Sequence, residues 1–326
     1  MSLIDSNPTC VNKNLSDIIA TIATYYALTS EGKNKYRYNA FVNASNTIAN
    51  WQHPIISGKQ AVKDIKGVGK STGEIIDEVL KTGYSTRLME LETIFSERKK
   101  FVDHFTSFFG IGPVKANELY SSKLRTVEDI YYKGNLTQAQ KLGIEWNDHT
   151  KIRINRDEMD EIAKEIGKRL NNMNITFDIA GSYRRLEVTS GDIDVLIKSN
   201  NNLKMDDIIL VLDGLLPATL AVGPTKFMGI IKLSENHNGH RIDIRLVHHI
   251  SYPYALFYFT GSKNFNILVR QRAIDLGYYL NEYGLYDNKN TFIICLSEND
   301  IFNKLGLQYV EPHNRLRDII SLFLSN

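Results

Sequence analysis

The sequence predicts a multi-domain protein with a helical N-terminal part and an α+β C-terminal part. Its 326 residues exceed the size of a typical single domain. Apolar residues recur at helical spacing up to about residue 150, and segments typical of β-strands alternate with helical segments after that point. With 43% hydrophobic and 23% charged residues, the composition is that of a folded soluble protein.

Composition also limits where the protein would work and with what. The sequence contains no run of about 18 apolar residues, the length that a membrane span needs. Its N-terminus lacks the basic and then apolar pattern of a signal peptide. The two cysteines, Cys10 and Cys295, lie too far apart in sequence for a disulfide framework. We therefore expect the protein to work in a reducing compartment, the nucleus or the cytoplasm. A location in a virion is an alternative. The net charge of +2 says little about nucleic acid, so any contact with DNA would depend on local clusters.

The helical part begins with two expected helices in residues 16–51 and then repeats one pattern twice. In residues 65–83, Gly67 and Gly69 form a tight turn, a helix follows, and Gly83 caps its end. In residues 108–120, a turn at Gly110 and Gly112 again opens a helix.

Such glycine turns have a physical use. They leave backbone N–H groups exposed at a helix N-terminus and let a phosphate approach closely. Sequence-independent DNA binding is therefore one interpretation, and an ordinary packing corner between helices is the other. The repetition favours DNA binding.

The C-terminal part is expected to hold an antiparallel or mixed sheet, followed by a region of helices and short strands. A terminal apolar-rich helix closes the sequence at 316–326. The expected helices of the sheet region are 157–170 and 206–216, and the expected strands are 175–180, 192–198, 227–233 and 241–247.

Three aspartates of this sheet carry the chemical prediction. Side chains alternate along a strand, so Asp192 and Asp194 share one face while Ile193 faces the core. The later strand "RIDIRL" places Asp243 on an open face between two arginines. Converging carboxylates repel unless cations neutralise them, and oxygen ligands select Mg²⁺ or Mn²⁺. Alone, a D-x-D pair is more often a solvated strand face.

The residues before the aspartates strengthen the metal interpretation. The Gly181-Ser182 turn can hold a terminal phosphate, and Arg184 or Arg185 can add a charge-assisted contact. A phosphate cradle beside metal-binding acids is a nucleotidyltransferase arrangement.

Several motifs in fixed order make the sequence similar to the family X DNA polymerases, in particular to their beta-like members. They are "GSYRR" with "SGDIDV" at 181–195, "TKFMG" at 225–229, "RIDIR" at 241–245 and "YFTGS" at 258–262, together with both glycine turns, "YNAF" at 38–41, "NEY" at 281–283 and "DIF…YVEP" at 300–312. The resemblance covers about residues 15–313.

The resemblance implies a helical lyase-like domain (1–94), a fingers domain with a second helix-hairpin-helix motif (95–150), a nucleotidyltransferase palm (151–258) and a small α/β thumb that binds the nascent base pair (259–326). It implies a monomer that binds gapped or nicked double-stranded DNA and dNTP, and no membrane. It also implies two Mg²⁺ ions, with Mn²⁺ as a substitute, and monovalent Na⁺ or K⁺ at the glycine turns.

The resemblance also assigns roles to residues. Asp192, Asp194 and Asp243 would be the catalytic, metal-binding acids. The nucleotide would contact Ser182, Arg185, Ser190, Gly191, Arg153, Tyr258, Phe259, Gly261, Asn266 and Arg270. DNA would contact Gly67, Gly69, Gly110, Gly112, Lys226 and Arg241.

Two positions depart from the family pattern. Ile75 stands where the family has the lysine nucleophile of its deoxyribose-phosphate lyase, and an isoleucine cannot form a Schiff base. Lyase activity is therefore absent or moved to Lys70, while Arg37, Lys70 and Arg87 could still form a 5′-phosphate pocket. Lys263 stands where beta-like members usually carry an acid beside the incoming base.

The sequence thus predicts an enzyme, a DNA-directed DNA polymerase that fills short gaps in base excision repair-type DNA repair. The short segment 233–240 favours templated synthesis, because template-independent relatives carry a longer loop there. A nucleotidyltransferase acting on RNA or small molecules would leave the glycine turns unexplained. A non-catalytic DNA-binding protein would leave the three aspartates without a purpose.

Overall fold

The computed structural model describes residues 12–28, 33–199 and 203–315, and these residues form two compact units that divide between Leu136 and Thr137. Cys10 and the expected terminal helix at 316–326 lie outside the described residues. Within the described part of the chain, no helix combines the length and the apolar character needed to cross a membrane.

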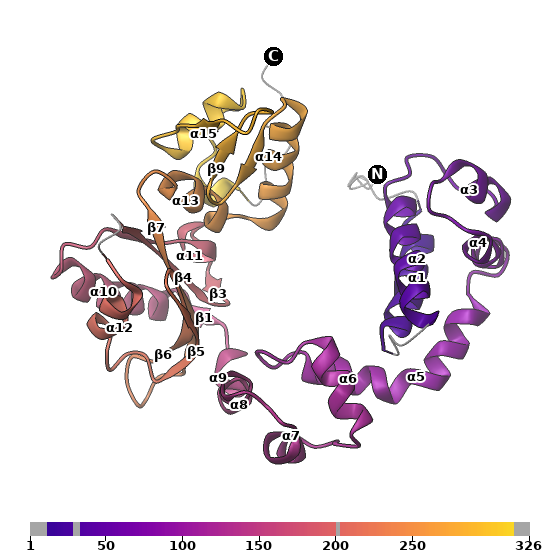
Figure 1. Ribbon diagram of the computed structural model, residues 1–326, viewed down its shortest axis with the longest axis horizontal. Helices are drawn as coiled ribbons and strands as arrows, with labels where there is room; N and C mark the ends of the chain where they lie inside the picture. The colour runs from indigo at the N-terminus through magenta and orange to yellow at the C-terminus, as the bar shows by residue number, and fades with distance from the viewer. Residues whose placement is uncertain (1–11, 29–32, 200–202, 316–326) are drawn as a thin grey trace, which may run out of the picture. The chain divides into compact units, whose positions relative to one another are not determined.

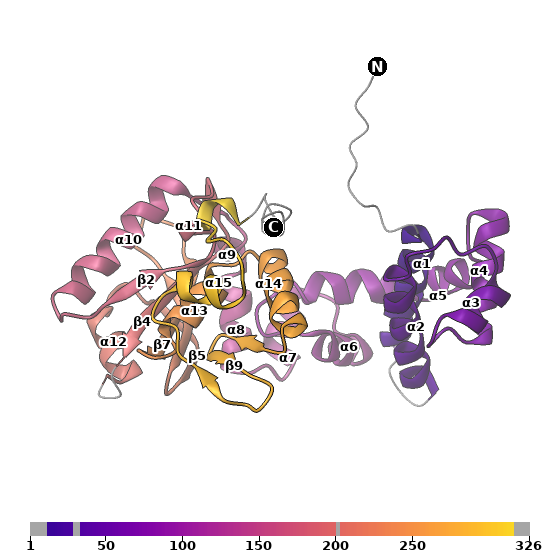
Figure 2. The same ribbon diagram turned by 90° about the horizontal axis from the view of Figure 1, so that it is seen from above.

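The N-terminal unit is helical, as predicted. The expected pair of helices packs side by side as α1 and α2 (Figures 1 and 2), with Ile19, Ile22 and Ile48 fully buried. The helices are α1 (Lys13–Ala27), α2 (Lys33–Ala49), α3 (Gly58–Asp64), α4 (Lys70–Thr82), α5 (Thr86–Phe105), α6 (Pro113–Ser121) and α7 (Val127–Lys133).

Both glycine turns have the same construction. The first glycine of each turn takes a left-handed conformation, with φ of +95° at Gly67 and +77° at Gly110. The last glycine of each turn, Gly69 or Gly112, is the N-cap of the following helix and supplies no side-chain cap. A Cβ atom at either N-cap would meet no atom within 4 Å. The first N–H groups of α4 and α6 therefore face open space, where an anion can approach.

The C-terminal unit is built on a five-stranded sheet in the order β2-β4-β7-β6-β5. Strands β4 and β7 run parallel and the other pairs run antiparallel, so the sheet is mixed. The elements up to this sheet's last strand are α8 (Gln138–Glu145), α9 (Asn147–Thr150), β1 (Ile154–Asn155), α10 (Arg156–Asn171), β2 (Phe177–Ile179), α11 (Gly181–Arg184), β3 (Thr189–Ser190), β4 (Ile193–Ser199), α12 (Met205–Val211), β5 (Ala218–Gly223), β6 (Lys226–Ile231) and β7 (His240–His248).

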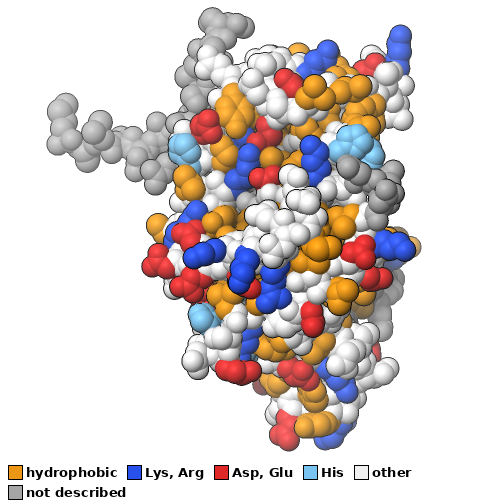
Figure 3. Space-filling view, turned by 90° about the vertical axis from the view of Figure 1, so that its left-hand side faces the viewer, with side chains coloured by type: hydrophobic (Ala, Val, Ile, Leu, Met, Phe, Trp, Pro, Cys, Tyr) orange, Lys and Arg blue, Asp and Glu red, His pale blue; other side chains and the backbone are white. Residues whose placement is uncertain are grey.

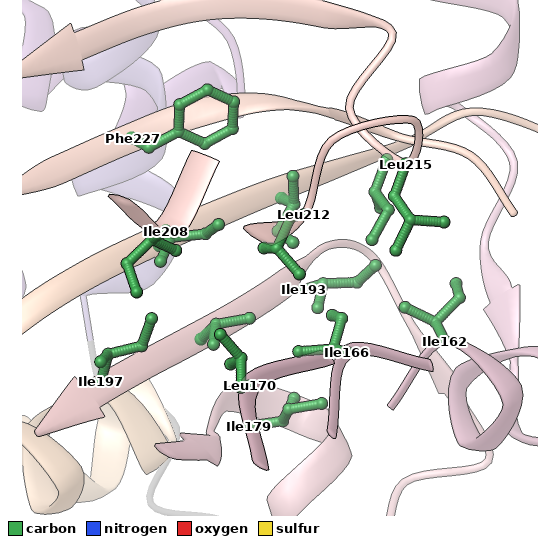
Figure 4. Close-up of a cluster of buried hydrophobic side chains, with 14 of the residues drawn as sticks. Ile162, Ile166, Leu170, Ile179, Ile193, Ile197, Ile208, Leu212, Leu215 and Phe227 are labelled. Atoms are coloured by element: carbon green, nitrogen blue, oxygen red, sulfur yellow. The ribbon is translucent and has the colours of Figure 1, made fainter. Parts of the chain in front are cut away.

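Helices α10 and α12 cover one face of the sheet (Figure 1). Ile166 and Leu170 of α10, Ile208 of α12, and Ile193 and Ile197 of β4 point toward one another in this layer (Figure 4). Acidic and basic side chains are interspersed over the side of the molecule that Figure 3 shows, which agrees with the small net charge.

The last part of the chain adds a small three-stranded sheet, in the order β10-β9-β8, with its own core. Its helices place Phe257, Phe265 and Phe302 in that core with 0–1% exposure. The elements are α13 (Tyr252–Thr260), α14 (Lys263–Asp275), β8 (Tyr279–Asn281), β9 (Gly284–Tyr286), β10 (Phe292–Ile293), α15 (Glu298–Lys304) and a 3₁₀ turn (Pro312–Asn314).

The expected helix at 206–216 was too long. The helix α12 ends at Val211, and Gly214 takes a left-handed φ of +78°, which an α-helix does not accommodate. Leu212 and Leu215 are nevertheless buried, so the apolar pattern continued beyond the helix into the turn.

Candidate active site

Two of the three aspartates lie at paired positions on neighbouring strands, and the third lies just before one of these strands. Asp194 on β4 is the direct register partner of Asp243 on the parallel strand β7. Asp192 comes immediately before β4 rather than within it. Ile193 and Val195 are fully buried, so alternation along the strand leaves both acids of the D-x-D pair on the other face of the sheet.

The electrostatics of the cluster indicate crowded negative charge. Burial, followed by the negative charges of Asp192 and Asp243, raises the pKa of Asp194 to about 7. Burial also raises the pKa of Asp243, although Lys226 and Arg241 act against the shift. A cation bound there would stabilise the ionised carboxylates and lower the pKa of both Asp194 and Asp243.

Basic residues surround the carboxylates. Arg241 donates to Asp192 over 3.1 Å, and Arg245 favours ionisation of both Asp194 and Asp243. Among the described residues, no three His, Cys, Asp or Glu side chains are already arranged as a complete metal-binding group. The three acids are neighbours, and an arginine binds one of them, Asp192. Three carboxylates are a set of oxygen donors that suits Mg²⁺ or Mn²⁺.

A cavity of about 460 Å³ opens beside this cluster. Nine of the residues that were expected to bind nucleotide or metal line it, and Asp243, Ser190, Gly191 and Arg153 do not. The lining consists of Gly181, Ser182, Arg185, Asp192, Asp194, Tyr258, Phe259, Gly261, Lys263, Asn266, Ile267 and Arg270.

The short helix α11 brings the phosphate-type residues against the acids. Gly181 takes φ of +58°, and a Cβ there would lie 2.6 Å from Asp194 Oδ2, so a larger residue would displace the carboxylate. Ser182 Oγ donates to Ser190 Oγ over 2.9 Å, which links the helix to the strand before the D-x-D pair. A Cβ on Gly191 would approach Arg153 Nη1 at 3.5 Å, so Arg153 lies beside this turn.

The two arginines of "GSYRR" have separate roles. Arg184 forms an ion pair with Glu298 at 2.6 Å and donates to Thr260 Oγ1, so it connects α11 to α13 and α15. Arg185 faces the cavity, where it donates to the Thr260 carbonyl over 2.6 Å and pairs with Glu187. The structure thus assigns Arg184 to a structural network and leaves Arg185 at the cavity.

The opposite wall of the cavity comes from α13 and α14. Asn266 Nδ2 donates to the Tyr258 carbonyl over 2.7 Å, whereas its buried Oδ1 has no hydrogen-bond partner among the described residues. Tyr258 and Phe259 both line the cavity, and the guanidinium of Arg245 lies 4.5 Å from the Phe259 ring centroid.

A second cavity, of about 950 Å³, lies in the N-terminal unit. It brings together the three cations that were expected to form a 5′-phosphate pocket, Arg37, Lys70 and Arg87, with Ile75 in its lining. The guanidinium groups of Arg37 and Arg87 both lie over the ring of Tyr26, at 5.6 and 5.7 Å from its centroid. Gly67 and Gly69 of the first glycine turn also line this cavity.

Comparison with known protein families accounts for most of the chain. The DNA polymerase beta palm matches residues 153–249, and the DNA polymerase beta thumb matches residues 255–316. A helix-hairpin-helix domain matches residues 10–85, and the fingers domain of DNA polymerase lambda matches residues 103–150. The chain belongs to the family X DNA polymerases. The resemblance predicted from the motifs is confirmed, and the architecture is that of a family X polymerase.

Individual family X relatives match along nearly the whole chain. The DNA polymerase lambda of Arabidopsis thaliana is 27% identical over 339 residues, covering 94% of this chain and 63% of the relative. The DNA polymerase lambda of Rattus norvegicus is also 27% identical, with 93% and 56% covered. The DNA nucleotidylexotransferase of Xenopus laevis is 28% identical, with 93% and 68% covered. The chain thus spans about three fifths of the length of these two lambda polymerases.

Sequence reasoning missed some members of this family X site. Glu187, the partner of Arg185, lies two residues away in sequence, and an acid so close to the arginine pair was a usable signal. Glu298 and the fully buried Arg315 complete the network of Arg184, but they lie more than 100 residues from it, and no local pattern indicates that contact.

Proposed function

We propose that the protein is a DNA-directed DNA polymerase that fills short gaps during DNA repair. It would transfer a nucleotidyl group from a dNTP to the 3′-OH of a primer. The observation that carries this proposal is the cavity in which Asp192 and Asp194 lie beside Gly181 and Ser182 at the start of α11, with Asp243 adjacent on the next strand. The two lambda relatives, both named DNA polymerases, support the same reaction class.

The carboxylates would hold the metal ions of the reaction. Two Mg²⁺ ions bound by Asp192, Asp194 and Asp243 would stabilise the attacking and leaving oxygens of the phosphoryl displacement. The fit rests on the three oxygen donors and on the raised pKa values of Asp194 and Asp243, for which burial is the main cause and the neighbouring carboxylates are a further one. Asp243 would lie nearest the primer end and accept the proton of its 3′-OH. Na⁺ or K⁺ would bind at the glycine turns.

The remaining residues would bind and orient the substrates. Tyr258, Phe259 and Gly261 would pack against the sugar and exclude a ribose 2′-OH. Asn266 and Arg270 would contact the nascent base pair. The triphosphate would bind to Ser182, Arg185, Ser190, Gly191 and Arg153, and DNA would bind to Lys226, Arg241 and the two glycine turns.

The protein would act as a monomer. Its functions would be distributed over the four expected domains, residues 1–94, 95–150, 151–258 and 259–326. The N-terminal cavity would bind the 5′-phosphate at the far side of the gap through Arg37, Lys70 and Arg87. It would lack Schiff-base chemistry, because the position of the nucleophile is Ile75 and an isoleucine has no amine.

Template-independent extension is the second candidate, because one relative is named a DNA nucleotidylexotransferase. The segment between β6 and β7 argues for templated synthesis, since it is short and anchored. His240 Nε2 and Glu158 Oε1 lie 2.8 Å apart, and a Cβ on Gly239 would come within 2.4 Å of the Trp146 ring. A segment held this way has little freedom to occupy the place of a template strand.

Primer extension tests the proposal. Gapped, recessed and blunt substrates would be compared with dNTP or NTP and Mg²⁺, using the wild type and Asp243→Ala. We expect extension on gapped DNA with dNTP, little on blunt ends, and loss in the variant with DNA binding retained. Wild-type protein that fails to extend any primer would refute the polymerase proposal. Equal extension without a template would favour the second candidate.

A further inference from the structure

Helix α11 carries residues of the active-site cavity but has little stability of its own. It spans only Gly181–Arg184, with Gly181 and Ser182 in the cavity lining and Arg185 at its C-terminal end. The hydrogen bonds that Arg184 and Arg185 donate back along the helix are long, at 3.2 and 3.3 Å. A single helical turn is unstable by itself, because ordering its backbone costs more than so few hydrogen bonds return. Contacts from outside the helix must therefore hold these residues in place.

Two residues of α10 hold α11 by its third residue, Tyr183. Arg156 donates from Nη1 to the Tyr183 carbonyl over 2.8 Å, and its guanidinium lies over the Tyr183 ring, 4.0 Å from the centroid. Asp160, one turn further along α10, accepts a hydrogen bond from the Tyr183 hydroxyl over 2.9 Å and lies 3.3 Å from Arg156 Nε. Arg156, Asp160 and Tyr183 together are called the Tyr183 clasp. The clasp fixes both the main chain and the side chain of Tyr183.

The place of Arg156 in α10 is explained by its contact with α11. Arg156 is the first residue of α10, where the positive end of the helix dipole disfavours a cation. Capping does not require it, because the Asn155 side chain already accepts the N–H of Glu158. A guanidinium is planar, so it can stack on a ring and still donate hydrogen bonds from its edge, which the ammonium of a lysine cannot do. The clasp therefore needs an arginine at this position.

The clasp would act on the cavity from outside. None of its three residues lines the cavity, so their effect on a bound nucleotide would pass through α11. Tyr183 directly follows Ser182, and its carbonyl also accepts the N–H of Leu186 in the turn after the helix. A shift of Tyr183 would thus move both the serine before it and the turn that carries Arg185 after it.

We propose that Arg156, Asp160 and Tyr183 are positioning residues, which hold Ser182 and Arg185 where the triphosphate of the incoming nucleotide binds. The proposal rests on the polymerase function proposed above. A triphosphate that is bound slightly out of place is poorly aligned for transfer, so the clasp affects the rate of the reaction as well as nucleotide binding. A residue that only stabilised the fold would change the fraction of active protein and leave the KM of that fraction unchanged.

The test compares variants of the clasp with a matched arginine of the same helix. Arg169 pairs with Glu165, four residues away in α10, and donates to the Asp213 carbonyl, but it does not contact α11. The variants are Arg156→Ala, Arg156→Lys, Asp160→Ala, Asp160→Asn, Tyr183→Phe and the control Arg169→Ala. The active fraction, and the KM and kcat for dNTP on a one-nucleotide gap, would be measured for each. Amide hydrogen exchange at residues 181–187 would be measured in the substrate-free protein.

The largest loss is expected for Arg156→Ala. Its kcat should fall about tenfold and its KM should rise about fivefold, because both contacts of the guanidinium with Tyr183 are lost. Exchange at residues 181–187 should be faster than in the wild type, since α11 opens more often. Arg156→Lys should keep most of this loss, because an ammonium cannot stack and donate in the same way. Arg169→Ala should match the wild type in all three measurements.

The hydroxyl contact should contribute less. Tyr183→Phe and Asp160→Ala should each lower kcat/KM about threefold, and the double variant should be no worse than either, because both remove the same hydrogen bond. Asp160→Asn should recover most of the loss, since an amide oxygen can still accept from the Tyr183 hydroxyl.

Three outcomes would overturn the proposal. They are unchanged exchange at residues 181–187 in Arg156→Ala, an equal loss in Arg169→Ala, and a loss of activity that the active fraction explains with KM unchanged. Wild-type protein that extends no primer would refute the polymerase function, and the exchange measurement would still decide whether the clasp holds α11.

Discussion

The cavity beside the aspartates and the cavity of the N-terminal unit contain similar binding groups but differ at the position where a reaction would begin. Each is lined by basic side chains and by glycines at or near the start of a helix. In the C-terminal unit, Asp194 and its register partner Asp243 bring carboxylates together beside the start of α11. In the N-terminal unit, the position at which the family resemblance expects the lyase nucleophile is Ile75, an apolar side chain. We therefore expect phosphate binding and chemistry to be separable in this protein, with one side chain deciding whether chemistry occurs in the N-terminal cavity.

The largest expected effect is the loss of the carboxylate charge in the C-terminal cavity. Asp194→Asn keeps the shape of the side chain but removes one of the carboxylates that we propose to bind metal. We expect primer extension to fall about a thousandfold while gapped-DNA affinity stays within about twofold. Extension rates and a DNA-binding titration on the same protein would measure both. Extension at the wild-type rate would show that this cavity does not house the reaction.

The same substitution should change how the stability of the metal-free protein depends on pH. The folded-state pKa of Asp194, about 7, exceeds the ordinary value of 3.8, so the folded protein binds this proton more tightly than the unfolded chain. Its contribution to stability is therefore present at low pH and is lost as pH rises toward 7. Between pH 5 and pH 8 we expect a loss of roughly 3 kcal/mol from this group.

Denaturant unfolding in the presence of a chelator would measure this effect. Asp194→Asn should lack that part of the pH dependence and should be more stable than the wild type at pH 8. Added Mg²⁺ should stabilise the wild type at pH 8 more than the variant. Identical pH dependence in the two proteins would mean that burial and the neighbouring carboxylates do not raise the pKa of Asp194 in the folded protein.

The N-terminal cavity offers the reverse experiment, a gain of chemistry. Ile75→Lys would place an amine among Arg37 and Arg87, and neighbouring cations lower the pKa of a lysine toward the neutral form that attacks a carbonyl. With an incised abasic site and borohydride, we expect a trapped covalent adduct for Ile75→Lys and only background for the wild type and Ile75→Ala. Efficient trapping by the wild type would contradict the assignment, and Lys70→Ala would then identify the nucleophile.

The sequence predicted local features of the active site better than its long-range contacts. The D-x-D pair was predictable, because strand alternation requires Ile193 and Val195 to be buried. Asp243 was placed near the pair as one option, but its register with Asp194 depends on a parallel pairing that no local pattern specifies. The helix at 206–216 was overestimated because its apolar spacing continues past the turn at Gly214.

The smallest expected effects separate the two glycine turns. Gly69 lines the N-terminal cavity and Gly112 does not, yet both are N-caps with open space around a would-be Cβ. Alanine at either position should change the free energy of unfolding by no more than about 1 kcal/mol, because neither glycine has a left-handed φ.

Each alanine variant should weaken binding to gapped DNA about threefold, because a methyl group keeps phosphate from the backbone N–H groups. Gly69→Ala should do so only when the gap carries a 5′-phosphate, whereas Gly112→Ala should do so with a 5′-phosphate or a 5′-hydroxyl. If both variants were equally sensitive to the 5′-phosphate, the first glycine turn could not be distinguished as a binding site for the strand end from the second as a binding site for the strand backbone.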